Sequence, residues 1–221
     1  MPRPSPSDTI AGVARGFADG FRVLAGDSPS WRAVVVVLIH RLAFGVLTVL
    51  LLLILRNTLN PSSDPDAALR GFSMVAAAVT VGALGAALIT PAMTRRMGTV
   101  RWTTVTLLIC AVAAPLTLIP VSLTALVLGA VVIGLSSQAA KIGGDTTLQR
   151  RIEDDHLGRV FSLYDVGVNI CLVLGALLVA VTAPTSGVSL LGFLALGVLY
   201  LVTAFWYGRT GSVERGSPAK A

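Results

Sequence analysis

The uncharged stretch that decides the fold reads WTTVTLLICAVAAPLTLIPVSLTALVLGAVVIGLSSQAA, residues 102–140. A helix crosses the hydrocarbon core of a bilayer with about 20 predominantly apolar residues. This stretch is therefore long enough for two crossings, and the segment PVS that begins at Pro120 provides the turn between them. A second uncharged stretch, residues 166–208, has room for another pair.

The whole chain has the same apolar character. Charged residues make up 13% of its 221 residues, whereas soluble domains carry about 25%, and the mean hydropathy is +0.82. The apolar residues come in blocks of membrane-spanning length rather than with the period of a strand or a surface helix. The sequence predicts an all-α membrane protein with six transmembrane helices, at about residues 33–55, 71–93, 102–119, 123–141, 160–183 and 188–207.

The basic residues predict the orientation of these spans. Fourteen of the 17 Lys and Arg residues lie in the N-terminal region, after the second span, after the fourth span or in the C-terminal tail. The opposite loops hold only Arg56 and Arg70. Because loops rich in Lys and Arg stay in the cytoplasm, both termini are expected there, in the cell membrane. The net charge of +6 is explained in the same way, without a nucleic-acid partner.

Four regions follow from this pattern: a disordered tail (1–8), an amphipathic helix (9–30), the six-span domain (31–208) and a cytoplasmic tail (209–221). In the amphipathic helix, apolar residues recur every three or four positions, while charged residues occupy the other side. Such a helix suits the membrane interface, and packing against a soluble partner would give the same pattern. The apolar positions are Ile10, Val13, Phe17, Phe21 and Leu24.

Several kinds of chemistry lack the residues that they require. The sequence has no G-x-x-x-x-G-K-[ST] phosphate-binding loop, no G-x-S-x-G nucleophile turn and no H-E-x-x-H zinc motif. Cys110 and Cys171 lie in apolar blocks without metal-ligand spacing. We therefore expect neither an enzyme nor a bound cofactor or metal.

Two polar residues interrupt the first span. Charged side chains inside a membrane are rare and mark functional sites, so Arg41 is a candidate for lining a cavity. Its position, about 12 Å past Ala33 along a helix, also allows the side chain to reach back to the interface. His40 is either a hydrogen-bonded packing residue or a proton relay.

The segment DTTLQRRIEDDHLGRVFSLYDVGVN, residues 145–169, is the most charged part of the chain. Ser162, Asp165 and Asn169 share one helix face by their spacing, and a similar stripe ends the fourth span. These stripes either line the inner mouth of a cavity, with Asp165 paired to a nearby cation, or form a static ion-pair cluster. The centre, RRIEDDH, is expected to be a solvated loop. The fourth-span stripe is Gln138, Lys141, Asp145 and Gln149, and the cations considered for Asp165 are Lys141, Arg159 and Arg41.

An amphipathic helix, six spans and an arginine-rich loop between the second and third spans resemble the C-terminal half of a major facilitator superfamily transporter. More narrowly, the layout is similar to the bacterial drug and siderophore exporter branch. TPAMTRRMGTVRW, residues 90–102, resembles the superfamily's loop motif, with Arg96, Gly98 and Arg101 at its basic and glycine positions. Arg95 stands where the motif has an acid, and Pro91 where it has its first glycine.

Gly158 and Arg159 match the penultimate cytoplasmic loop of that branch, and the resemblance covers about residues 10–207. Members of the superfamily bind substrate between two six-span halves. The resemblance therefore implies three partners: the lipid bilayer, a second six-span half from another copy or a separate chain, and a small-molecule substrate.

The leading hypothesis is half of a secondary active transporter that exports small amphipathic or hydrophobic compounds in exchange for protons. Two alternatives are a truncated or split transporter without activity alone, and a non-transporting membrane interaction protein. The expected substrate or proton pathway consists of His40, Arg41, Asp165 and Asn169. The expected cytoplasmic gate consists of Arg95, Arg96, Gly98, Arg101, Lys141, Asp145, Gly158 and Arg159.

Overall fold

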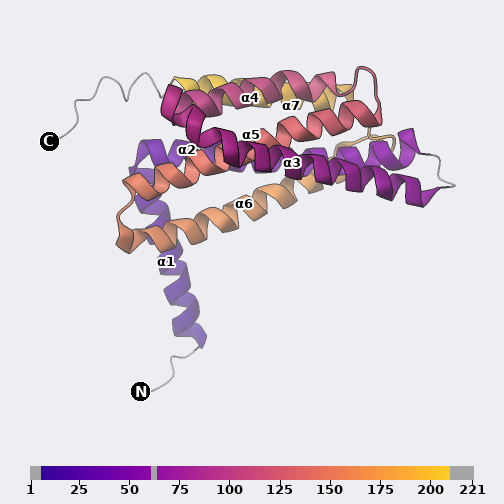
Figure 1. Ribbon diagram of the computed structural model, residues 1–221. Helices are drawn as coiled ribbons and strands as arrows, with labels where there is room; N and C mark the ends of the chain where they lie inside the picture. Colours follow the sequence, from indigo (N-terminus) through magenta and orange to yellow (C-terminus); the bar gives the residue numbers. More distant parts are fainter. Residues whose placement is uncertain (1–5, 61–63, 210–221) are drawn as a thin grey trace.

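The computed structural model describes residues 6–60 and 64–209, and Figure 1 shows their arrangement. Within these residues the chain forms seven α-helices and no strand. Six of the helices are long and apolar enough to cross a membrane, which confirms the expected six-span fold. Most of the expected N-terminal tail and nearly all of the expected C-terminal tail lie outside the described residues.

The helices begin and end near the expected positions, but several extend further into the flanking segments. A π-helical turn, Leu55–Leu59, prolongs the first span. The helices are α1 (Pro6–Gly26), α2 (Ser28–Ile54), α3 (Pro65–Met97), α4 (Thr99–Leu116), α5 (Leu123–Arg151), α6 (Asp154–Thr182) and α7 (Leu190–Gly208).

The link between α5 and α6 is much shorter than expected. The expectation that RRIEDDH forms a solvated loop is wrong, because only Ile152 and Glu153 separate the two helices. Basic residues end α5, and acidic residues begin α6. These charges complement the dipoles of the two helix ends, so they stabilise the helices that the charge density had argued against.

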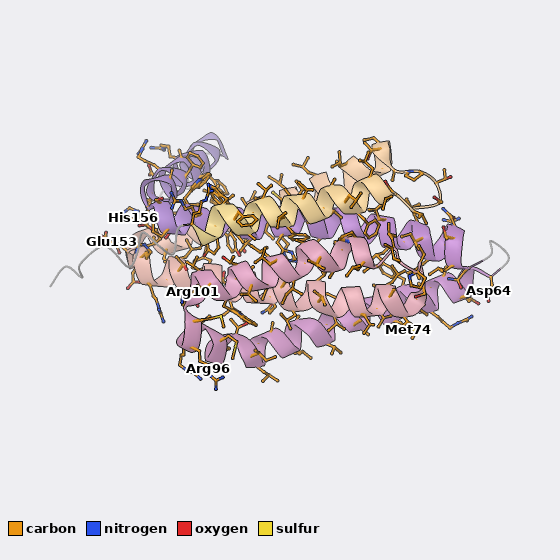
Figure 2. All side chains as sticks on the ribbon, turned by 90° about the horizontal axis from the view of Figure 1, so that it is seen from above. Asp64, Met74, Arg96, Arg101, Glu153 and His156 are labelled. Atoms are coloured by element: carbon orange, nitrogen blue, oxygen red, sulfur yellow. The ribbon has the colours of Figure 1, made fainter. Side chains whose placement is uncertain are left out.

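The arginine-rich loop between α3 and α4 is reduced to one residue. Gly98 has φ +87°, a conformation that residues with a Cβ atom rarely adopt, and both flanking residues are helical. We call the end of the bundle that contains Asp27, Gly98 and Glu153 the arginine-rich end. Figure 2 shows Arg96, Arg101, Glu153 and His156 at this end and Asp64 at the opposite one.

Close contact between α2 and α6 depends on a pair of glycines. A Cβ atom on Gly45 would overlap the carbonyl oxygen of Leu172, and one on Gly175 would overlap that of Leu42. Small residues at such crossings allow two backbones in a membrane to approach closely. This pair is one of the two most extensive contacts between spans.

The contact between α3 and α5 is built in the same way. Cβ atoms on Gly82 and Gly134 would overlap the carbonyl oxygens of Val131 and Val79. If α2, α3 and α4 exchange places in order with α5, α6 and α7, the α2–α6 crossing becomes the α5–α3 crossing. This correspondence is expected for a three-span repeat. Gly85 of α3, by contrast, has open space around its Cβ position.

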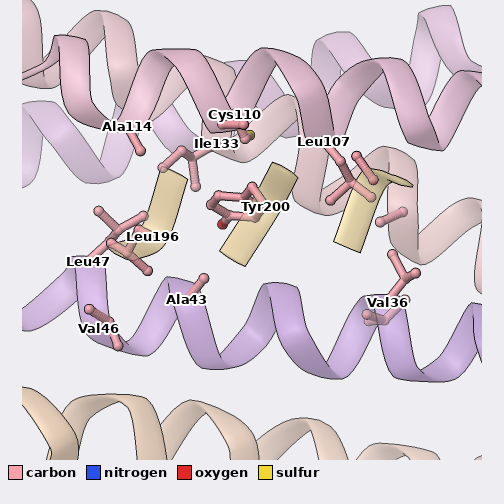
Figure 3. Packing of buried hydrophobic residues seen from close by; sticks show 14 of the residues in the cluster. Val36, Ala43, Val46, Leu47, Leu107, Cys110, Ala114, Ile133, Leu196 and Tyr200 are labelled. Carbon is pink, nitrogen blue, oxygen red and sulfur yellow. The ribbon is translucent and has the colours of Figure 1, made fainter. Parts of the chain in front are cut away.

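The two remaining spans, α4 and α7, pack together along one edge of the bundle, opposite α6 and α1 (Figure 1). Tyr200 of α7 is fully buried, and Figure 3 shows it among Cys110, Leu107 and Ala43 from α4 and α2. The core is therefore continuous across the bundle. By contrast, α6 is the least buried of the six spans.

Candidate functional site

Charged residues from three spans gather around Tyr164 at the arginine-rich end. Lys141 Nζ lies 3.2 Å from a carboxylate oxygen of Asp145 and 5.1 Å from the centre of the Tyr164 ring. Tyr164 is buried. Asp145, Arg41 and Asp165 are all close enough to interact with it electrostatically. The expected stripes on α5 and α6 thus meet α2 in one polar cluster.

Arg41 lies deep in the membrane-spanning part of α2, about 20 Å from its first residue. Its guanidinium carbon is 6.0 Å from the centre of the Phe44 ring, at the outer limit of a cation–π contact. Its Nε is buried, and no acceptor for it is found in residues 6–60 or 64–209. If the Arg41 side chain extended fully into interfacial water, its Nε would be solvated. Because Nε is buried instead, the geometry favours a role inside the bundle.

His40 has different neighbours from the adjacent Arg41. It is 1% exposed, and its ring centre lies 5.2 Å from that of Tyr200 on α7. Neither ring nitrogen has a hydrogen-bond partner within the described ranges. His40 therefore belongs to the interior between α2 and α7, whereas Arg41 belongs to the cluster around Tyr164.

On α6, Ser162, Asp165 and Asn169 lie on one exposed face, as their spacing predicts. The Ser162 hydroxyl donates to the carbonyl of Gly158 at 2.9 Å, and Asn169 Nδ2 donates to the carbonyl of Asp165 at 2.8 Å. The expected ion pair of Asp165 is not formed: in the part of the chain that the structure describes, its carboxylate has no cation within 4.0 Å. An exposed aspartate thus stands in a membrane span.

The candidate cations that were considered for Asp165 have other partners or neighbours. Lys141 pairs with Asp145, and Arg159 lies 3.9 Å from Asp19 of α1. Next to this pair, a Cβ atom on Gly20 would lie 3.0 Å from the carbonyl oxygen of Arg159, so α1 and α6 are in close backbone contact. Arg159 thus connects the two helices at the arginine-rich end.

Asp27, between α1 and α2, forms the most complete ion pair at this end. Its carboxylate accepts hydrogen bonds from Arg151 Nε at 2.9 Å and Nη2 at 2.9 Å, and from the Ser30 amide that it caps. Partial burial raises the pKa of Asp27, but the hydrogen bonds from Arg151 and Ser30 outweigh it and hold the pKa below the ordinary 3.8. The carboxylate is therefore ionised at neutral pH and ties α2 to the end of α5.

The expected gate residues between α3 and α4 surround the Gly98 turn. Arg95, Arg96 and Arg101 are all exposed, and Gly158 on α6 also has open space around it. Below the turn, Trp102 Nε1 donates to Thr90 Oγ1 at 3.1 Å and joins α4 to α3. The arginines are thus presented to solvent by a rigid helix pair.

Sequence reasoning missed several residues that shape the site. Phe44 and Tyr164 contact the cations Arg41 and Lys141, but an aromatic residue in an apolar block gives no signal of its own. Asp27 precedes Ser28 and Pro29, a recognisable helix start that could have been found. The ion pair of Asp27 with Arg151 could not have been found from the sequence, because the two residues are far apart along the chain.

This arrangement of six spanning helices with charged groups inside the bundle defines a multi-pass α-helical membrane protein. Residues 33–221 match the family model described as Major Facilitator Superfamily, which covers most of the chain. The chain belongs to this superfamily, and it is a membrane transporter protein by family and by its six apolar helices. No match was found among curated proteins or among solved structures.

Proposed function

We propose that this chain is one six-span half of a secondary active transporter that exports small amphipathic or hydrophobic compounds in exchange for protons. The observation that carries the proposal is Asp165, an exposed carboxylate in a membrane span. Lipid cannot solvate a carboxylate, so such a group faces a water-filled cavity or another protein. Arg41 and Asn169 contribute to the same cavity, and His40 acts from the bundle interior.

A second six-span half supplies the other wall of this cavity, from another copy of the chain or from a separate one. The two least buried spans, α3 and α6, flank the central helices α5 and α2. Their exposed faces offer a broad surface for a second half, while α4 and α7 remain for contact with the lipid bilayer. The resemblance to the second half of drug and siderophore exporters supports the same arrangement.

The arginine-rich end lies in the cytoplasm in this proposal, with both termini, because of the excess of Lys and Arg there. The ion pair Arg159–Asp19 joins α6 to α1 and acts as a gate contact that breaks and reforms as the halves rock. Lys141 and Asp145, which pair with each other along α5, belong to the same gate. The exposed residues Arg95, Arg96, Gly98, Arg101 and Gly158 complete this gate.

The experiment has two stages. The tagged chain is first purified gently from its native membrane, and a second six-span chain in equal amount, or a self-dimer, is expected. A lone, degraded monomer would contradict the two-half arrangement.

The assembled protein is then reconstituted in vesicles, and efflux of a lipophilic dye is measured with and without a pH gradient. Asp165→Asn is expected to abolish the dependence on the gradient. The control Asp155→Asn changes an exposed carboxylate in the first turn of α6 and is expected to leave the dependence of efflux on the gradient intact. Gradient-dependent efflux by Asp165→Asn at the unaltered rate would show that the proposed proton coupling is wrong.

A further inference from the structure

An apolar cavity of about 260 Å³ lies within this single half, beginning one helix turn beyond Arg41. Five of the six spans contribute to its wall: α2, α3, α4, α5 and α7. Most of its wall is inside this half, and it reaches the exposed face of α3 at Ala76. Residues that define it include Phe44, Leu47, Val75, Ala130 and Phe193.

The side chains that line this cavity offer no free hydrogen-bond donor. Its only polar side chains are Thr48 and Thr117, and both hydroxyls are already used. They donate to the carbonyl oxygens of Phe44 at 2.8 Å and Ala114 at 2.6 Å. A polar ligand group placed there would lose its hydrogen bonds to water without replacement, so the cavity suits an apolar body.

Phe44 joins this cavity to the charged cluster. One side of the residue lines the cavity, and its ring also lies beside the Arg41 guanidinium. Arg41 has a buried Nε without an acceptor in the described residues. Buried donors without partners are uncommon in folded proteins and mark places where an acceptor binds.

We propose that this half binds an amphipathic monoanion, with its carboxylate at Arg41 and its apolar body in the cavity beyond Phe44. Arginine suits this role because its guanidinium stays charged and binds carboxylates through parallel hydrogen bonds. The inference rests on the proposed function in taking the ligand to be the transported compound. It narrows the substrate class from amphipathic or hydrophobic compounds to those with one negative charge.

The size of the cavity suggests a probe. An apolar cavity of about 150 Å³ in another protein holds benzene, so a cavity of about 260 Å³ has room for two fused rings. 2-Naphthoate carries such a body and one carboxylate. 2-Naphthamide has the same shape without the charge and serves as the matched ligand.

The experiment measures binding rather than transport. The purified full-length chain is placed in phosphatidylcholine nanodiscs, and displaceable binding of radiolabelled 2-naphthoate and 2-naphthamide is determined for the wild type and three variants. Arg41→Gln removes the charge at the site. Arg56→Gln removes an exposed charge at the opposite end of the same span. Ala130→Leu fills part of the cavity, and Ala76→Leu does so from an exposed position and replaces the first variant if that variant does not fold.

For Arg41→Gln we expect 2-naphthoate to bind about 10- to 100-fold more weakly, the range for losing a charge-assisted hydrogen bond. The affinity of Arg41→Gln for 2-naphthamide should stay within about twofold of the wild-type affinity. The Arg56→Gln variant should match the wild type with both ligands, and the cavity variant should weaken both. Equal binding of 2-naphthoate by the wild type and Arg41→Gln, or no displaceable binding at all, would overturn the assignment.

A lipid headgroup is the other source of an anion at Arg41. In nanodiscs that contain phosphatidylglycerol, 2-naphthoate should bind with unchanged affinity. If the anionic lipid abolishes its binding, Arg41 holds a lipid phosphate and the substrate assignment is wrong. These outcomes are separate from those for the proposed function, because they measure equilibrium binding of two ligands without a gradient, whereas the proposed function is tested by gradient-dependent efflux.

Discussion

The helices α6 and α7 both lie at an edge of the bundle and turn a long face outward, but the chemistry of the two faces differs. On α6, the half nearest the arginine-rich end exposes Arg159, Ser162, Asp165 and Asn169. On α7, the exposed residues are aliphatic or aromatic, and they are Leu190, Leu191, Leu194, Ala195, Val198, Leu201, Val202, Phe205 and Trp206. The comparison separates a face suited to water or protein from a face suited to lipid.

The difference begins with the way in which each helix is attached. Gly175 of α6 fits directly against the carbonyl of Leu42, and Gly45 of α2 fits back against α6. On α7, a Cβ atom on Gly197 would lie 2.8 Å from the carbonyl oxygen of Ala111, a less severe conflict. One half of α6 can therefore remain polar and exposed because a backbone contact, rather than side-chain burial, holds the helix in place.

The largest effect is expected from Gly175→Leu, which places a side chain where two backbones meet. Overpacking of a close contact costs about 1–3 kcal/mol or more, so we expect loss of the monodisperse peak in size-exclusion chromatography. Gly197→Leu should lower the melting temperature without abolishing the peak. The control Gly85→Leu, which projects into open space, should behave as the wild type, and equal damage by Gly85→Leu would contradict this account.

A smaller effect is expected from exchanging the chemistry of the two faces. Val198→Asp puts a carboxylate at the middle of α7 on the apolar face, which costs about 2.5–3.5 kcal/mol of insertion free energy. Asp165→Val makes the opposite change on α6 and should leave the inserted yield unaltered or higher. The yield of membrane-inserted chain, measured for both variants, checks this. Equal yields for the wild type and Val198→Asp would mean that this face of α7 does not contact lipid.

The number of spans could be predicted from sequence because membrane-crossing length and low charge depend on composition alone. The shared face of Ser162, Asp165 and Asn169 could be predicted too, since helical periodicity determines it. The helix faces that contact one another could not be predicted from the sequence. The adjacent residues Arg41 and His40 point to different neighbours, and only the packing of α2 against α6 and α7 decides which one enters the charged cluster.

The error at the α5–α6 link has a specific cause. A dense run of charges usually indicates a loop, but Arg150 and Arg151 end one helix while Asp154 and Asp155 begin the next. Each sign is placed where it stabilises the helix end. The number of charges suggested a loop, whereas their order, basic and then acidic, is typical of one helix ending and the next beginning.

The smallest effect is expected at the polar contact that secures the arginine-rich end beside α6. Asp27→Asn keeps a side chain that can cap α2 but removes the ion pair with Arg151. Because both groups contact solvent, we expect a loss of about 0.5 kcal/mol at pH 7, measured as a lower melting temperature. The control Asp64→Asn, which caps α3 and pairs with Arg70 at the opposite, exposed end, should change the melting temperature less.

The pH dependence of this loss separates the ion pair from a packing effect. The folded state lowers the pKa of Asp27, so the stabilisation is fully present above the ordinary value of 3.8 and disappears as the pH falls through the lower, folded value. The melting temperatures of the wild type and Asp27→Asn should therefore differ at pH 7 and converge below pH 3.8. A difference that persists unchanged at low pH would assign the effect to packing around α2 rather than to the ion pair with Arg151.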